Sequence, residues 1–445
     1  MAQLIVSISG IRGIVGDGLG PQEAKRFALA FGTHLGGGTV VLARDSRPHG
    51  PMLAEAFCSG LVAAGCRVLD AAILSTPGTA VMVQHIGASG GAVITASHNP
   101  APYNGIKLLS AVGQGLSRRE GLAVADLYHR QTFRQAPGGR VESLADAGRI
   151  HTERVLTVTD ADTIRNACFR VVVDAVNGAG GAEMRLLLER LGCTCSMIHG
   201  EPTGDFGRAP EPVPENLGDL CQAVRHQRAA IGLALDPDAD RLSLVDETGR
   251  AIGEEYTLAL ACRHRLTQQQ GPLAANLSTS RMMDDVALEA GVALHRTPVG
   301  EVNVSEAIQK HGCLIGGEGN GGVIDPRVVL VRDSLAGAAL ILGMMATSGK
   351  SLGQFPGELP VYTLVKEQVP LGQARPDRVL RAVREHFTDA KVDDRDGVHL
   401  AWAKGWLHVR PSNTEPILRI IAEASEERTA RGLVRQVADL VRGQS

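Results

Sequence analysis

The sequence of 445 residues is poor in aromatic side chains, which make up only 3% of it. Stacking of nucleobases or sugar rings on aromatic faces is therefore not expected to dominate ligand recognition. The formal net charge is only −3 at pH 7, and no long basic tract is present. These two features argue against a nucleic acid or a membrane surface as a partner.

Paired cysteines and long apolar runs are also missing. The eight cysteines are scattered and include one C-x-C, Cys193 and Cys195, but no C-x-x-C. This pattern is typical of reduced thiols and predicts neither a disulfide framework nor a zinc site. The longest strongly apolar stretch, at 336–346, is too short to span a bilayer, and the N-terminal segment MAQLIVSISGIRG lacks the features of a secretory signal. We therefore expect a cytoplasmic protein.

The sequence does contain a recurring pattern of helices and strands. A helix-like run that ends in glycine and leads into a short apolar strand occurs three times, at Gly65, Gly192 and Gly291. Glycine just after a helix supplies the left-handed turn that ends it. Two near-continuous apolar runs, 169–176 and 229–236, are typical of strands that are covered on both faces. The alternation predicts an α/β protein with three related units.

The C-terminal part has a different pattern. A segment rich in glycine and proline, at 349–362, precedes a helix-like run at 376–387, and strand-like segments joined through the turn DDRDG follow. Strands paired through an Asp-Gly turn and flanked by helices predict a small α+β domain. The domains are expected to span 1–150, 151–252, 253–360 and 361–445.

Three carboxylates, Asp236, Asp238 and Asp240, alternate directly after a predicted strand. They would repel one another unless a divalent cation neutralised them, and hard oxygen ligands suit Mg²⁺ or Ca²⁺. An EF-hand loop begins with the same spacing, but Arg241 stands where that loop requires glycine, and the flanking segments look like strands. An acidic surface turn without an ion is the alternative.

The segment RPSNTEP, at 410–416, concentrates groups that bind anions. A guanidinium, two hydroxyls, an amide and their backbone N–H groups lie in one turn between strand-like segments, and they suit a phosphate. The residues are Arg410, Ser412, Asn413 and Thr414. The alternative is a turn whose side chains cap their own backbone.

The glycine-rich segment GGEGNGG, at 316–322, invites comparison with a dinucleotide-binding loop. Such a loop needs a helix directly after it, whereas the residues that follow here look extended. Glu318 and Asn320 are therefore interpreted as ligands of sugar hydroxyls, and a plain turn is the alternative.

The segment TASHNP places Ser97 and His98 directly after an apolar run. A serine hydrolase would need a base oriented by a third group, and Ser97 does not stand in a G-x-S-x-G elbow. A helix cap is the structural alternative. Together with a cation site and a phosphate cradle, Ser97 favours phosphoryl transfer, which relies on positioning and charge neutralisation.

Further cations lie near these motifs in the sequence. Lys107 follows Ser97 closely, Arg12 lies in a glycine-rich N-terminal loop, and Arg44 and Arg47 follow a predicted strand. Lone arginines are more often surface residues or partners in structural ion pairs, so we weight the arginines lower than Lys107.

In their order along the chain, TASHNP, DPDADR, GGEGNGG and RPSNTEP resemble the four signature loops of the α-D-phosphohexomutases. The resemblance covers essentially the whole chain. It implies three similar α/β domains, with mixed sheets between helices, and a smaller α+β domain around a central cleft. It also implies interconversion of hexose 6-phosphate and hexose 1-phosphate through a phosphoserine and a 1,6-bisphosphate.

The resemblance also implies roles for single residues. Ser97 would carry the phosphate and, with Asp236, Asp238 and Asp240, hold one Mg²⁺ per chain. A hexose 1,6-bisphosphate would act as activator, and the protein would be a monomer or a homodimer. The other implied residues are Arg12, His98, Lys107 and Arg241 around the reacting centre, and Glu318, Asn320, Arg410, Ser412, Asn413 and Thr414 for binding the substrate, to which Arg241 also contributes.

Two positions depart from the pattern of the family. Asn320 and Gly322 stand where many members have a serine and a histidine, so another group must take any role of that histidine. Glu301 is closer to the acidic residue typical of members that act on glucosamine phosphates, and the loops look like the archaeal-type branch. Glucosamine is therefore the first choice of sugar, with mannose and glucose as alternatives. Remoter alternatives are a non-catalytic sugar-phosphate binding protein and a Mg²⁺-dependent phosphatase.

Overall fold

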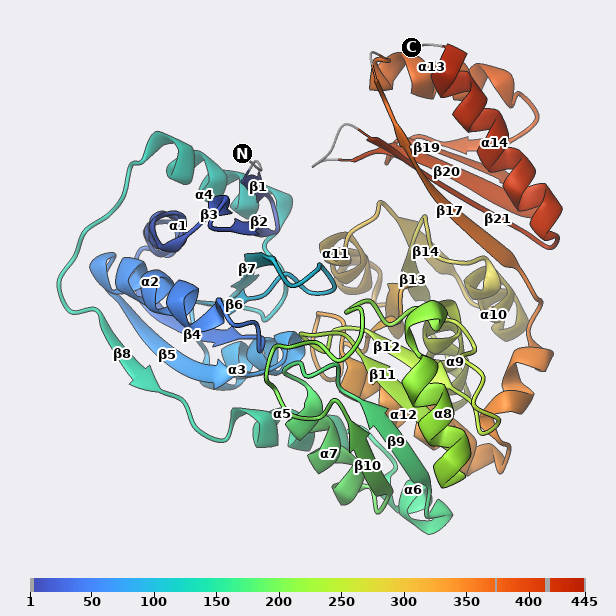
Figure 1. The fold of residues 1–445 in the computed structure, drawn as a ribbon, viewed down its shortest axis with the longest axis horizontal. Helices are drawn as coiled ribbons and strands as arrows, with labels where there is room; N and C mark the ends of the chain where they lie inside the picture. The colour runs from blue at the N-terminus through green and yellow to red at the C-terminus, as the bar shows by residue number, and fades with distance from the viewer. Residues whose placement is uncertain (1–3, 373, 413–416, 444–445) are drawn as a thin grey trace.

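The computed structural model describes residues 4–372, 374–412 and 417–443. These residues form four sheets with associated helices, which follow one another along the chain (Figure 1). Asn413 and Thr414, which the sequence assigns to the phosphate loop, lie outside the described residues.

The first unit is built on an eight-stranded sheet with helices on its faces. The strands are β1 (Ile5–Ser7), β2 (Gly10–Val15), β3 (Gly18–Leu19), β4 (Gly38–Arg44), β5 (Cys66–Ile73), β6 (Gly90–Ile94), β7 (Tyr103–Ser110) and β8 (Arg140–Ser143). The helices are α1 (Pro21–Leu35), α2 (Gly50–Ala63), α3 (Thr76–Ile86) and α4 (Arg118–Arg130), and α5 (Ala147–Leu156) leads into the second unit.

The second and third units each have a four-stranded sheet. The second consists of α6 (Ala161–Ala167), β9 (Arg170–Asp174), α7 (Gly181–Arg190), β10 (Thr194–Ile198), η1 (Pro214–Asn216), α8 (Gly218–Gln227), β11 (Ile231–Leu235) and β12 (Leu242–Val245). The third consists of α9 (Glu254–Gln268), β13 (Leu273–Asn276), α10 (Met282–Ala290), β14 (Leu294–Thr297), α11 (Glu301–His311), β15 (Ile315–Glu318), β16 (Gly322–Ile324), α12 (Ser334–Ser348) and η2 (Leu352–Glu358).

The three units share one strand order. In each, a central strand lies between two parallel neighbours, and one of these neighbours pairs antiparallel with a fourth strand. The orders are β5-β4-β6-β7, β10-β9-β11-β12 and β14-β13-β15-β16. The prediction of three related α/β units with mixed sheets is confirmed, and Gly65, Gly192 and Gly291 adopt the expected positive φ after α2, α7 and α10.

The last unit is an antiparallel sheet of order β17-β21-β20-β19-β18 that is packed against two helices. This arrangement confirms the predicted α+β domain. Its elements are β17 (Thr363–Pro370), α13 (Pro376–His386), β18 (Lys391–Asp393), β19 (Val398–Trp402), β20 (Gly405–Pro411), β21 (Ile417–Ala424) and α14 (Glu427–Gly443).

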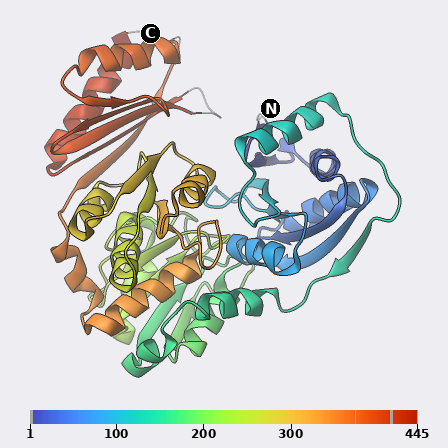
Figure 2. The ribbon, with the colours of Figure 1, turned by 180° about the vertical axis from the view of Figure 1, so that it is seen from behind.

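The buried apolar side chains form several clusters, of which a large one lies within the first unit alone. One cluster of buried side chains runs through the first three units and includes Val41, Val173, Leu235, Ile315 and Ile341. Seen from behind, α12 lies alongside elements of the second unit, where it contacts α5, α6 and α7 (Figure 2). The fourth unit has a core of its own, made by β17–β21 with α13 and α14. The first three units are therefore fused, whereas the fourth is packed separately.

The apolar stretch at 336–346 is the middle of α12, which is buried almost throughout. Within the described ranges, no single helix is long and apolar enough to cross a membrane. Only α12 together with η2 meets the length and composition of a span, and the chain bends by 88° between them.

Candidate active site

Three of the four sequence motifs occupy the same position in the three related units. TASHNP follows β6 and leads to β7, the aspartates lie between β11 and β12, and the glycine-rich segment forms the hairpin between β15 and β16. The motifs are therefore equivalent connections from the third strand to the fourth. Because no helix follows the hairpin directly, the structure excludes a dinucleotide-binding loop there.

Ser97 is buried, and its side chain points at the acidic loop of the second unit. Its Oγ donates to Asp236 Oδ2 over 2.7 Å, across the boundary between units. The backbone has φ +49°, a conformation that residues other than glycine adopt only when their surroundings impose it. No helix begins at Ser97, so the helix-cap alternative is wrong.

Arg47 holds the Ser97 loop in this conformation. Its fully buried guanidinium donates to four carbonyls of the loop and its flank, including those of Ser97 at 2.7 Å and Asn99 at 2.6 Å. Asp45 neutralises it through a 3.1 Å ion pair and also accepts from Thr95 Oγ1 at 2.7 Å. Arg47 is thus a structural cation, as the sequence suggested for lone arginines, and it fixes the position of the serine. Arg44 donates to the backbone carbonyl of Asp45 at 3.2 Å.

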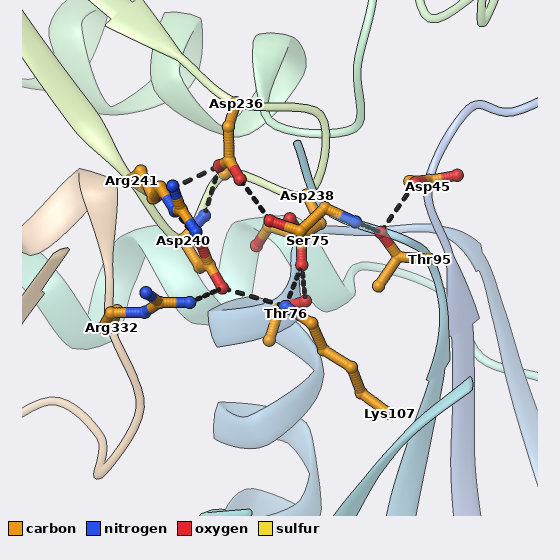
Figure 3. A network of polar contacts seen from close by, with 12 residues as sticks. Asp45, Ser75, Thr76, Thr95, Lys107, Asp236, Asp238, Asp240, Arg241 and Arg332 are labelled. Atoms are coloured by element: carbon orange, nitrogen blue, oxygen red, sulfur yellow. Dashed lines mark hydrogen bonds and ion pairs between the residues drawn. The ribbon is translucent and has the colours of Figure 1, made fainter. Parts of the chain in front are cut away.

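The carboxylates of Asp236, Asp238 and Asp240 converge in the interior and are fully buried. Lys107 Nζ donates to Asp238 Oδ2 at 2.6 Å and to Asp240 Oδ2 at 2.9 Å, and Thr76 Oγ1 donates to Asp238 Oδ2 at 2.6 Å (Figure 3). The surface-turn alternative is therefore wrong. An EF-hand is excluded as well, because antiparallel strands flank the loop rather than helices.

The aspartates fit a divalent cation. One carboxylate oxygen from each lies within 4.8 Å of the others. Asp238 Oδ1 and Asp240 Oδ1 are buried and accept no hydrogen bond within the described part of the chain. A buried carboxylate oxygen without a donor is costly, and a hard cation is the partner that such oxygens suit.

The charges in this loop shift each other's pKa values. Burial, with Asp240 and Asp238 beside it, raises the pKa of Asp236 well above its usual range. Burial alone would raise the pKa of Asp240 too, but Arg332, Lys107 and Arg241 outweigh it and lower the pKa. Burial disfavours the charged form of Lys107, yet Asp238 and Asp240 raise its pKa, so this side chain stays a cation.

The other residues predicted around the reacting centre lie close to Ser97 or to the aspartates. His98 Nδ1 is 3.5 Å from Ser97 Oγ, and burial, assisted by Arg241 and Arg12, lowers the pKa of His98 to about 2. The imidazole is therefore neutral at physiological pH. Arg12 Nη1 donates to Asn99 Oδ1 at 2.7 Å. Arg241 donates its backbone N–H to Asp236 Oδ1 at 3.1 Å.

In the third unit, the Glu318 carboxylate is held on several sides. Its Oε1 accepts from Asn276 Nδ2 at 2.7 Å and from the Gly300 N–H at 3.1 Å. Its Oε2 accepts from Arg332 Nη1 at 2.7 Å. Asn320 lies at the tip of the same hairpin, with Oδ1 3.4 Å from Arg332 Nη1.

Arg332 was not predicted, although it connects two of the loops. Its Nη2 donates to Asp240 Oδ2 at 2.7 Å and its Nε to Glu301 Oε2 at 3.0 Å, in addition to the bond to Glu318. Arg332 lies between an apolar run and α12, and its only signal in the sequence is a charge in an otherwise apolar region. Thr76 and Asn276 were missed as well, because neither belongs to a motif.

The phosphate motif lies in the fourth unit, apart from the aspartates. Arg410 Nε donates to Asp396 Oδ1 at 3.3 Å, and Asp396 Oδ2 accepts the Val299 N–H of the third unit at 2.9 Å. The Ser412 N–H donates to the Ile417 carbonyl at 2.9 Å, which pairs the two ends of the turn. The structure thus places the segment that the sequence predicts to bind a phosphate in a different unit from the three aspartates.

Comparison with known families identifies the chain. The α/β/α domains I, II and III of the phosphoglucomutase/phosphomannomutase family match residues 4–135, 150–249 and 253–362, and the family's C-terminal domain matches residues 367–440. The chain belongs to the phosphoglucomutase/phosphomannomutase family.

Similar proteins match over nearly the full length. A probable phosphoglucosamine mutase of Methanopyrus kandleri is 38% identical, and the match covers 98% of this chain and 97% of the relative. A phosphoglucomutase/phosphomannomutase of Thermococcus kodakarensis is also 38% identical, with 95% of each chain covered. Among solved structures, that of a putative phosphomannomutase from Thermus thermophilus has a TM-score of 0.85, with 28% identity and full coverage of both chains.

Proposed function

We propose that this protein is a hexose-phosphate mutase that works through a phosphate on Ser97. The observation that carries the proposal is the 2.7 Å hydrogen bond from Ser97 Oγ to Asp236, within a buried group of three carboxylates. A hydroxyl fixed beside a cation site, with Lys107 at hand, is arranged for phosphoryl transfer, where charge neutralisation and positioning supply most of the rate.

The reaction follows as two transfers. The Ser97 Oγ–P bond breaks as the free hydroxyl of a hexose 6-phosphate or 1-phosphate forms a new O–P bond. The proton of that hydroxyl ends on Ser97 Oγ, so the products are a 1,6-bisphosphate and a free serine. The bisphosphate then reverses its orientation, and its other phosphate returns to Ser97. Arg410 and Ser412 bind the phosphate that does not react, so the enzyme holds both ends of the bisphosphate at once. A hexose 1,6-bisphosphate in solution primes an unphosphorylated Ser97.

We assign the cation site to Mg²⁺, held by Asp236, Asp238, Asp240 and the phosphate on Ser97. Bound there, the ion would offset negative charge on the transferring group. Lys107 and Arg12 add fixed positive charge, and Arg47 keeps the serine in place. Glu318 accepts hydrogen bonds from the sugar hydroxyls. Neutral His98 orients the phosphoserine or donates a hydrogen bond to it.

Glucosamine phosphate is the proposed preferred substrate. The similarity to relatives named as probable phosphoglucosamine mutases supports this choice, as does Glu301 at the start of α11. The equally similar relative named phosphoglucomutase/phosphomannomutase keeps mannose and glucose phosphates as the second candidates.

The test is ³¹P NMR of the protein with Mg²⁺ and a trace of hexose 1,6-bisphosphate. Glucosamine, mannose and glucose 6-phosphates are supplied in separate samples, and Ser97→Ala is the control. A growing 1-phosphate signal that the control lacks supports the mutase, and the relative rates identify the sugar. Release of free phosphate without isomerisation would instead indicate the phosphatase. Binding of a sugar phosphate without any turnover would indicate a non-catalytic binding protein.

A further inference from the structure

Gly322 and Arg332 compete for one volume beside the sugar loop. A Cβ atom at position 322 would lie 2.1 Å from Arg332 Cδ and 2.8 Å from Arg332 Cγ, closer than real atoms approach. The φ of Gly322 is not in the positive range, so its backbone does not itself require glycine. The side chain of Arg332 is what excludes any larger residue at position 322.

Gly322 lies directly opposite Glu318 in the β15–β16 pair. The space that Arg332 fills therefore borders the β15–β16 hairpin, residues 316–322, which we call the sugar loop. From there its guanidinium reaches Glu318 at 2.7 Å, Asp240 at 2.7 Å and Glu301 at 3.0 Å. A planar guanidinium can donate to several acceptors in fixed directions, which the point charge of a lysine cannot do. One side chain therefore joins Glu318 of the sugar loop, Asp240 of the aspartate loop between β11 and β12, and Glu301 at the start of α11.

Arg332 also remains charged. A guanidinium keeps its proton throughout the pH range in which proteins are folded. A group that never releases its proton cannot act as an acid or a base. Its contribution has to come from position and charge.

We propose that Arg332 is a positioning residue. Its side chain occupies the space that any residue larger than glycine would need at position 322, and from there it fixes Glu318 relative to Asp240. The sugar hydroxyls bound by Glu318 are thereby held at a set distance from the phosphate on Ser97. The positioning role rests on the mutase function proposed above, whereas the shared volume does not. A proton transfer during the reaction must involve a group other than Arg332.

The shared volume is tested by a double-mutant cycle on thermal stability, without substrate or metal. Gly322→Ala is expected to lower Tm in the wild type and in Arg332→Lys, because lysine keeps the colliding Cγ and Cδ. The same change should cost little in Arg332→Ala, which removes both atoms. Gly218→Ala is the matched control, since a Cβ there meets nothing within 4 Å. If Gly322→Ala is harmless in the wild type, or costs equally in all three backgrounds, the proposal is wrong.

Arg332→Ala removes a shared cation from three carboxylates, of which Asp240 keeps Lys107, and can fail to fold. In that event Glu301→Gln is added to reduce the excess negative charge, and the cycle is run on the pair Glu301→Gln/Arg332→Ala against Glu301→Gln alone. The expected result is the same: Gly322→Ala lowers Tm only where Cγ and Cδ of residue 332 are present. Equal losses with and without these atoms would overturn the proposal.

The positioning role is tested by kinetics of Arg332→Lys. We expect kcat, measured well below Tm, to fall about 100-fold through the lost alignment, while the kept charge limits the loss in Tm. A purely structural role would lower Tm and kcat together, and an unchanged kcat would overturn the positioning role. If the wild type itself isomerises no sugar, the proposed function and the positioning role both fail. The result of the stability cycle would still decide the shared volume.

Discussion

The fused first three units and the separate fourth unit are held together in opposite ways. One apolar cluster runs through the first three, in addition to clusters within single units, and the groups that cross their boundaries, such as Ser97 with Asp236 and Thr76 with Asp238, are buried. The fourth unit has its own core, and its contacts with the third include polar ones, such as Ser278 Oγ with His408 Nδ1 at 2.8 Å and Val299 N with Asp396.

This difference matches the two tasks of the proposed reaction. Phosphoryl transfer at Ser97 needs groups fixed within fractions of an ångström, which a close-packed interior supplies. The distal phosphate has to be held in two orientations of the bisphosphate, and a polar interface between domains can rearrange at small cost. We therefore expect the fourth unit to move relative to the others when ligand binds, while the first three units keep their arrangement.

The largest expected effect is at Ser97. Ser97→Ala removes the group that would carry the phosphate, so kcat should fall by at least about 10³-fold. Binding of a sugar phosphate to the variant should persist. The measurement is the isomerisation rate by ³¹P NMR together with titration calorimetry. Ser59→Ala, on the exposed face of α2, is the matched control and should retain full activity. Full activity of Ser97→Ala would contradict the account.

The next effect concerns His151 of α5, which lies between a carboxylate of the second unit and one of the third. Its Nδ1 lies 2.7 Å from Glu183 Oε1 and its Nε2 lies 2.9 Å from Asp333 Oδ2. Burial alone would lower the pKa of His151, but Asp333 and Glu183 raise it to about 10. The stabilisation is therefore complete below pH 6.5, the value for a free histidine, and it decreases as the pH rises towards 10.

Over this range the loss in unfolding free energy should be roughly 3–5 kcal/mol. Denaturant unfolding between pH 6.5 and 10 measures it, and His151→Gln should flatten the dependence. An equally steep dependence in His151→Gln would show that another group is responsible.

In the fourth unit, Arg410→Ala is expected to weaken substrate binding more than it slows the chemistry. Hydrogen bonds to charged groups contribute about 1.5–3 kcal/mol, so KM should rise about 10- to 100-fold. Steady-state kinetics with the preferred sugar phosphate measures the change. Arg395→Ala removes an exposed arginine that pairs with Asp393 in the same unit and should leave KM unchanged. An unaltered KM in Arg410→Ala would exclude Arg410 from the phosphate site.

The smallest expected effect concerns His408, at the polar interface between the third and fourth units. Its contribution to stability should respond to pH in the opposite direction from that of His151. Burial lowers the pKa of His408, which contacts Ser278 of the third unit. Since the folded-state pKa lies below the free value of 6.5, this contribution is present above pH 6.5 and is lost as the pH falls below it. Acidification to pH 5 should therefore weaken the attachment of the fourth unit.

Hydrogen exchange of the segments 276–281 and 396–408 at pH 7 and pH 5 would show this loosening. His408→Gln should remove the difference between the two pH values. Equal protection of wild-type protein at both pH values would contradict the assignment of this contact to neutral His408.

The sequence predicted the architecture because its signals are local. Apolar runs such as 231–235 are buried on both faces, and the helices α1, α3, α10, α11 and α12 are each followed by a glycine with positive φ. The proposed site loops could also be found, because each is a short polar motif at a strand end. Asn413 and Thr414 lie outside the described residues, and their assignment stays a prediction.

The hydrogen bonds and ion pairs that connect the motifs could not be predicted from local sequence patterns. Thr76 reaches Asp238 across 162 residues and Arg332 reaches Asp240 across 92, so neither contact falls within a sequence window. His151 belongs to no motif, and its contacts with Glu183 and Asp333 arise from the packing of the second unit against the third. Long-range ion pairs depend on the tertiary fold, which periodicity and spacing do not specify.

The most direct test of the central claim is mass spectrometry of the protein after incubation with a hexose 1,6-bisphosphate and Mg²⁺, followed by addition of a hexose 6-phosphate. The account predicts one phosphate on the peptide that contains Ser97, which disappears as bisphosphate forms from the added sugar. A phosphate on another residue, or a Ser97 that stays unmodified while sugar is isomerised, would contradict it.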